Sequence, residues 1–116
     1  MLCVPSGFEA FPLVMVEAMA RAVPVMASAS GTVAEMLDHG RAGVVVEPVT
    51  AAAWTAALRT ALDNPDELAG LGRAGRERAV ELYTDAAMVD DYQRAFARVL
   101  DRPIPGGPAD PAAVLR

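Results

Sequence analysis

Residues 4–48 read VPSGFEAFPLVMVEAMARAVPVMASASGTVAEMLDHGRAGVVVEP, and this stretch decides the fold. Five segments alternate around it: we expect strands at 1–5, 24–27 and 44–46, and helices at 12–22 and 32–35. This order, with its short connections, is typical of parallel strands joined by right-handed crossovers. The sequence therefore predicts an α/β fold built on a short parallel sheet.

The rest of the chain is predicted to be helical up to about Leu100. Thr50 and Thr84 are expected caps, and the run from Asn64 to Glu67 places a proline and acids at a helix start. The proline- and glycine-rich residues 102–116 are predicted to be a disordered tail, which leaves 1–101 as one domain.

Three parallel strands leave open sheet edges, and parallel sheets are normally covered on both faces. We therefore expect the chain to be the second half of a doubly wound domain, and its abrupt start in a strand at Met1 supports this. The exposed sheet edge would favour association with a partner.

Composition narrows the classes of function. The net charge of −5 and the pI near 4.7 argue against binding to nucleic acid or to an anionic membrane surface. The chain contains no lysine, and its single cysteine, Cys3, cannot form an intrachain disulfide. No secretion signal or membrane-length apolar run is present, so a cytoplasmic location is the expectation.

Glu17 lies in a segment, 12–22, that is otherwise apolar on every side. Such a segment predicts a buried helix, in which an unpaired carboxylate costs several kcal/mol, roughly. Hydroxyl groups of a bound ligand are plausible partners for it. Glu9 precedes Glu17 with seven residues between them, and the pair is more informative than either residue alone.

Residues 4–48 resemble the donor-binding core of retaining glycosyltransferases that have the GT-B fold, specifically the family 4 type. The resemblance rests on Pro5-Ser6, the E-x7-E pair Glu9 and Glu17, Glu17-Ala-Met-Ala20, Pro24-Val25, Gly31 with Glu35, and Gly43 before the valine strand. It implies that the chain is the carboxy-terminal, nucleotide-sugar-binding part of a Rossmann-like domain, followed by carboxy-terminal helices.

The resemblance also implies roles for individual residues. Glu9 would be the catalytic residue that holds the hydroxyls of the transferred sugar, and Glu17 would accept bonds from both ribose hydroxyls. Backbone amides at the helix start would hold the diphosphate; they belong to Ala10, Phe11 and Leu13. Residues expected to support this site are Ser6, Gly7, Gly31, Thr32 and Glu35.

The implied reaction transfers a sugar, with retention, from a nucleoside-diphosphate sugar to an acceptor hydroxyl on a glycan, lipid or small molecule. It implies neither a metal nor a cofactor. The family's basic residues for the diphosphate and its acceptor domain would lie upstream of Met1, so the isolated chain is expected to be inactive. A non-catalytic module that binds a nucleotide or packs against a partner is the alternative, and a flavodoxin-like phosphate-binding domain is a third interpretation.

Some residues depart from the family pattern or admit a structural explanation. Glycine is common in the family at the positions of Ala10, Pro12, Ala22 and Thr32. These departures leave the predicted fold intact but count against the family's usual geometry of phosphate binding. Thr32 and Glu35 match a capping box, and a structural role is favoured for Glu35. Other residues with structural interpretations are Ser28 and Ser30 (turn residues), His39 (loop, no metal cluster), Trp54, Tyr83 and Tyr92 (packing).

A second motif resembles a dinucleotide-binding fingerprint. Gly70, Gly72 and Gly75 have the spacing G-x-G-x-x-G, but no strand precedes them. We expect them instead to mark a bend or break between helices.

Overall fold

A computed structural model describes residues 1–100, which divide into one compact unit, Met1–Val80, and a second that begins at Glu81. The elements in chain order are β1 (Leu2–Val4), α1 (Leu13–Ala20), β2 (Val25–Ser28), α2 (Val33–Met36), the 3₁₀ turn η1 (Asp38–Gly40), β3 (Val44–Val46), α3 (Ala51–Asp63), α4 (Pro65–Leu82) and α5 (Asp85–Leu100). The predicted tail, 102–116, lies outside the described residues.

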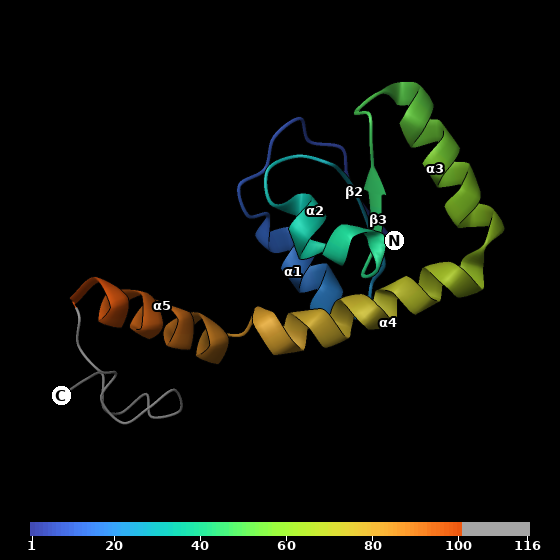
Figure 1. Ribbon diagram of the computed structural model, residues 1–116. Helices are drawn as coiled ribbons and strands as arrows, with labels where there is room; N and C mark the ends of the chain where they lie inside the picture. Colours follow the sequence, from blue (N-terminus) through green and yellow to red (C-terminus); the bar gives the residue numbers. More distant parts are fainter. Residues whose placement is uncertain (101–116) are drawn as a thin grey trace. The chain divides into compact units, whose positions relative to one another are not determined.

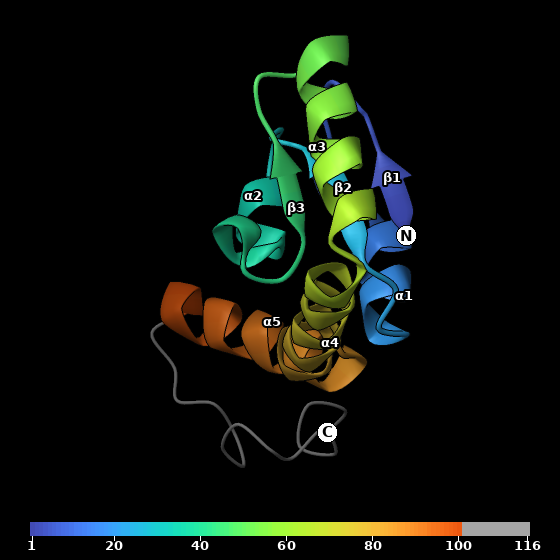
Figure 2. The same ribbon diagram turned by 90° about the vertical axis from the view of Figure 1, so that its right-hand side faces the viewer.

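The three strands form one parallel sheet, as predicted; their order is β1-β2-β3, with Cys3 opposite Met26 and Ala27 opposite Val45. Figure 1 shows α1 and α2 on one side of the sheet and α3 on the other. The loops that follow the strands lie together at the carboxyl edge of the sheet, and α4 runs past the opposite edge (Figures 1 and 2). Ligands of open α/β sheets bind outside the carboxyl ends of the strands, so these loops are where a site is expected.

The side of the sheet that faces α3 carries an apolar cluster. Met26 and Val46 are buried there with Ala61 of α3, and Trp54 packs against them, which confirms the predicted packing role of Trp54. The indole Nε1 of Trp54 donates to the hydroxyl of Ser28 at 3.3 Å. Ser28 is therefore a buried residue at the end of β2 and not the turn residue that the sequence suggested.

Two helices begin at the threonines expected to cap them. The hydroxyl of Thr50 accepts from the amide of Ala53 at 3.2 Å, and that of Thr84 accepts from the amide of Ala87 at the same distance. Each bond satisfies one of the amides that lack a partner in the first turn of a helix.

Helix α4 is continuous through Gly70, Gly72 and Gly75, so the predicted bend at these glycines is wrong. The two buried glycines instead let the helix backbone approach the connections that precede β2 and β3. A Cβ on Gly72 would lie 2.5 Å from the carbonyl oxygen of Ala22, and one on Gly75 would lie 3.1 Å from that of Ala42. The G-x-G-x-x-G spacing is therefore explained by the packing of α4 and not by nucleotide binding.

The second unit contains α5, whose exposed face carries Tyr92 stacked on Phe96 with ring centroids 6.3 Å apart. On the same helix, Arg94 forms ion pairs with Asp90 and Asp91 at 2.5 and 2.8 Å. No helix within residues 1–100 combines the length and the apolar character that crossing a membrane requires.

Candidate functional site

The loop between β1 and α1 forms one wall of the candidate site. It leaves the sheet at its carboxyl edge and carries Glu9, whose side chain is partly buried. Helix α1 begins at Leu13, one residue later than predicted, with Pro12 as its N-cap, and the carbonyl of Pro12 accepts from the amide of Met15 at 2.9 Å. The amides of Leu13 and Val14 belong to the first turn and have no acceptor within the helix, so this end of α1 favours an anion.

The loop between β2 and α2 forms the second wall and holds the first in place. Gly31 has a φ of +53°, and a Cβ there would lie 1.7 Å from the carbonyl oxygen of Glu9. The hydroxyl of Thr32 donates to the carbonyl oxygen of Ala10. Two of the residues expected to support the site thus touch the residues that were expected to bind the donor.

The predicted capping box at the start of α2 is wrong. Thr32 has helical φ and ψ angles and makes no side-chain cap, because its hydroxyl is used by Ala10. Glu35 is exposed and makes no reciprocal cap; its carbonyl oxygen accepts from Arg78. The hydroxyl of Thr32 therefore bonds to a residue 22 positions away in the chain instead of to an amide of its own helix.

The predicted burial of Glu17 is also wrong. Its side chain is exposed, and on the same face of α1 Leu13 and Val14 are 66% and 49% exposed. Only Met15 and Met19 of the helix are buried. The desolvation argument for a ligand at Glu17 therefore fails for this chain, and its role as a ribose ligand stays a prediction that rests on the E-x7-E pattern.

Large apolar side chains are exposed around the same loop. Phe8 is 75% exposed, and Phe11, Leu13 and Val14 are exposed as well. Large apolar side chains exposed this close together in the sequence favour a binding surface for a ligand or another protein. The carboxylate of Glu17 lies one turn after Leu13 and Val14, so charge and apolar area share one face of α1.

Three further predicted residues lie in these two loops. Ser6 is partly buried, and Gly7 has open space around its Cα, so nothing in the structure requires glycine there. The hydroxyl of Ser30 is buried without a hydrogen-bond partner among the described residues. Such a group costs about 1–3 kcal/mol, which makes it a feature that the fold alone does not explain.

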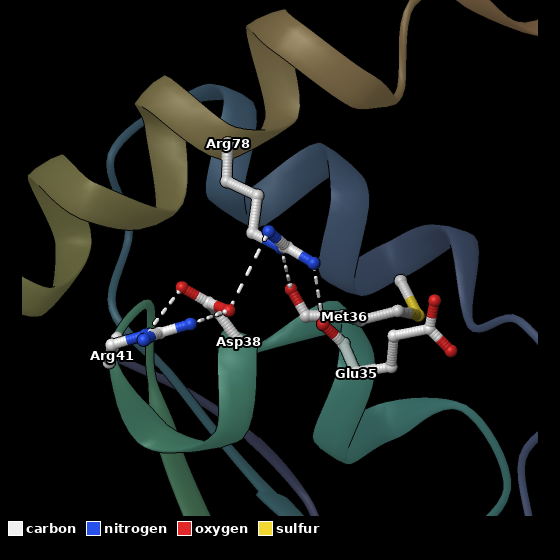
Figure 3. Close-up of polar contacts among 5 residues, drawn as sticks. All are labelled: Glu35, Met36, Asp38, Arg41 and Arg78. Atoms are coloured by element: carbon white, nitrogen blue, oxygen red, sulfur yellow. Dashed lines mark hydrogen bonds and ion pairs between the residues drawn. The ribbon is translucent and has the colours of Figure 1, made fainter.

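The far end of α2 is held by arginine side chains that sequence analysis did not single out. Arg78 of α4 donates to the carbonyl oxygens of Met36 at 3.0 Å and Glu35 at 2.8 Å, and it lies 3.8 Å from the carboxylate of Asp38 (Figure 3). Arg41 donates twice to the same carboxylate, at 2.6 and 2.7 Å. The hydrogen bonds from Arg41, with smaller contributions from nearby positive charges, lower the pKa of Asp38 below its ordinary value although desolvation opposes them.

A pocket of about 390 Å³ lies away from Glu9 and Glu17, between β3, α3 and α4. His39, Thr60, Asn64 and Glu67 are its polar lining residues. Within residues 1–100, no group of three or more histidine, cysteine or carboxylate side chains is arranged to hold a metal ion.

Comparison with known proteins decides the family. The family model described as glycosyl transferases group 1 matches residues 1–78, which contain both loops and the E-x7-E pair. The chain belongs to this family. The match confirms the resemblance inferred from the sequence.

Relatives of known function agree with that assignment. The chain is 41% identical over 102 residues to the MMP alpha-(1->4)-mannosyltransferase of Mycolicibacterium hassiacum, covering 84% of this chain and 25% of the relative. It is 40% identical over 99 residues to the D-inositol 3-phosphate glycosyltransferase of Gordonia bronchialis, covering 83% of this chain and 22% of the relative. The chain thus spans about a quarter of the length of these relatives.

A solved structure confirms the fold. Sucrose-phosphate synthase from Thermosynechococcus elongatus superposes with a TM-score of 0.74 at 33% identity, over 85% of this chain and 25% of that one. The chain therefore has the fold of part of a GT-B domain, as the sequence predicted.

Proposed function

We propose that the chain contributes the nucleotide-sugar site of a retaining glycosyltransferase. Family membership supports sugar transfer as the reaction class, and the arrangement of the β1–α1 loop supports the location. The observation that carries the proposal is that Gly31 and Thr32 fix the loop of Glu9 and Ala10 at the carboxyl edge of the sheet. A backbone held in this way presents its donors to a ligand without reorganising.

In this proposal the first turn of α1 faces the diphosphate of the donor. The amides of Ala10, Phe11 and Leu13 are the proposed donors, and the amino end of α1 contributes a positive dipole. Pro12 has no amide hydrogen, so it contributes none. Neither a metal nor a cofactor is part of the proposed chemistry.

The two glutamates are proposed to bind the two sugar rings of the donor. Glu9, which is partly buried, is proposed to hold hydroxyls of the transferred sugar and to orient the anomeric carbon. Glu17 is proposed to accept from the ribose hydroxyls. Because Glu17 is exposed here, water competes for its oxygens, and we expect the 116-residue chain to bind a nucleotide weakly and to have little or no transferase activity.

Calorimetry on the chain with UDP, GDP and ADP tests the proposal. At least one nucleotide should bind, and Glu17→Ala should weaken it by about tenfold or more, since bonds to a charged acceptor are lost. Glu77→Ala, which removes an exposed carboxylate of α4, is the matched control and should leave affinity unchanged. Undiminished binding by Glu17→Ala refutes the ribose assignment, and a folded chain that binds none of the three refutes the donor site.

A non-catalytic accessory module is the second candidate, and the exposed apolar side chains of Phe8, Phe11 and Leu13 favour it. Such a module would use this face and the open sheet edge to pack against another protein. Sedimentation of the chain alone discriminates between them: self-association that Phe8→Ser reverses, together with no nucleotide binding, favours the module.

A further inference from the structure

Helix α4 makes side-chain contacts with the carboxyl ends of both helices that begin at the candidate site. Arg76 donates to the carbonyl oxygen of Ala20 at the end of α1. Arg78 donates to the carbonyl oxygens of Glu35 and Met36 at the end of α2 (Figure 3). The last carbonyls of a helix lack intrahelical donors and carry partial negative charge, so a guanidinium satisfies both needs.

The contact of Arg78 is more than a surface ion pair. Its Nε and one terminal nitrogen reach two successive carbonyls, while the other terminal nitrogen lies 3.8 Å from Asp38. The side chain is mostly covered, with 23% of its area exposed. A planar guanidinium with donors in a fixed fork can make these contacts together, whereas an ammonium group cannot.

Helix α2 connects this anchor directly to the candidate site. The helix has only four residues, Val33–Met36, of which Val33 and Met36 are buried. Immediately before it, Thr32 donates to the carbonyl of Ala10, and Gly31 lies against the carbonyl of Glu9. A single helical turn has little room to bend between two fixed ends, so a shift at its carboxyl end moves its amino end.

We propose that Arg78 is a positioning residue for the loop between β1 and α1 (residues 5–12), the proposed donor loop: by clamping the carboxyl end of α2, it holds Thr32 and Gly31 against the backbone of Glu9 and Ala10. Arg78 touches no ligand in this scheme. The inference rests on the proposed function for its consequence in binding, but its structural part, the placement of the loop, is independent of that function.

Hydrogen exchange on the 116-residue chain tests the structural part without any ligand. Arg78→Met should increase exchange of the amides in 6–11 as well as in α2, while α3 stays unchanged. Arg73→Met, which removes an exposed arginine of the same helix, is the control and should change neither segment. If exchange in 6–11 is unchanged in Arg78→Met, the proposal is wrong.

A double-mutant cycle tests the route through Thr32. If Arg78 acts through this hydroxyl, Thr32→Val alone should increase exchange in 6–11, and adding Arg78→Met should change it little further. Independent, additive effects of the two substitutions would overturn the route. Should Arg78→Met fail to fold, Arg78→Lys replaces it, since lysine keeps the charge but cannot reach both carbonyls and Asp38 together.

Nucleotide affinity then links the anchor to function. Arg78→Met should weaken binding of the best of UDP, GDP and ADP by about tenfold, and Arg73→Met should not. If Arg78→Met loosens the loop but leaves affinity intact, Arg78 does not position the donor site. If the wild-type chain binds no nucleotide, the proposed function fails, and hydrogen exchange alone still decides whether Arg78 places the loop.

Discussion

Substituting Gly31 by alanine should push the loop between β1 and α1 away from α2. The new Cβ would lie 1.7 Å from the carbonyl oxygen of Glu9 and 2.8 Å from its carbonyl carbon. Both atoms belong to the backbone, so no side-chain rotation relieves the clash. The φ of +53° adds strain, because a left-handed conformation costs a non-glycine residue about 1–2 kcal/mol.

The expected loss of stability is the sum of the clash and the strain, reduced by an effect on the unfolded chain. Relief of overpacking by backbone movement costs about 1–3 kcal/mol, and alanine regains about 0.4–1 kcal/mol by restricting the unfolded chain. We therefore expect Gly31→Ala to lower the free energy of unfolding by about 1–4.5 kcal/mol, measured by urea denaturation. Nucleotide binding should be lost in the same variant, because the displaced carbonyl belongs to Glu9.

Substitutions at two other glycines distinguish the effect of backbone strain from that of the steric clash. Gly40 has a φ of +98°, and a Cβ added there would meet no atom within 4 Å, so Gly40→Ala reports strain alone. Gly7 has neither a positive φ nor a close neighbour, and Gly7→Ala should be nearly neutral. If Gly31→Ala is no more destabilising than Gly40→Ala, the close approach of the two loops is not a constraint and the reasoning fails.

Two further predictions concern α4 and η1. Gly72→Ala should lower the free energy of unfolding by about 1–3 kcal/mol, because its Cβ would lie 2.5 Å from the carbonyl oxygen of Ala22. A Cβ on Gly70 in the same helix would meet only the end of the Arg73 side chain, at 3.8 Å, so Gly70→Ala should raise that free energy by about 1 kcal/mol. Urea denaturation that gives both variants the same sign contradicts the packing explanation. The lowered pKa of Asp38, due first to its hydrogen bonds with Arg41, means that its ionised form stabilises the folded state above about pH 4 and that this contribution is lost as the pH falls through the folded-state pKa. Circular dichroism should show a smaller loss of stability on acidification in Asp38→Asn, and an unchanged acid transition would contradict that role.

Local signals in the sequence predicted much of the fold. The alternation of apolar runs and helix starts predicted the parallel sheet, and β3 has the bounds expected for it. Thr50 and Thr84 cap their helices because the acceptor and the amide are three residues apart, which a sequence pattern can capture. Family membership was predictable because the motif residues lie in order within 4–48.

The errors arose where distant segments meet. Thr32 was expected to cap its own helix, but its hydroxyl reaches Ala10, and no local pattern encodes that choice. Glu17 was expected to be buried because its helix is apolar all round, yet composition does not say which side of a helix another element covers. Arg78 carried no signal either, since its acceptors are backbone carbonyls, which every residue possesses.

Where Gly31 contacts Glu9, the two backbones touch each other directly. Its geometry is therefore indifferent to which side chains stand at positions 9 and 10, so long as position 31 lacks one. The side chains of this loop can therefore differ, as Ala10 does from the glycine common in the family, while the distance between the loop backbone and α2 stays the same. Substitutions at positions 9 and 10 can therefore probe the proposed site without moving its backbone, whereas any side chain at position 31 would displace that backbone.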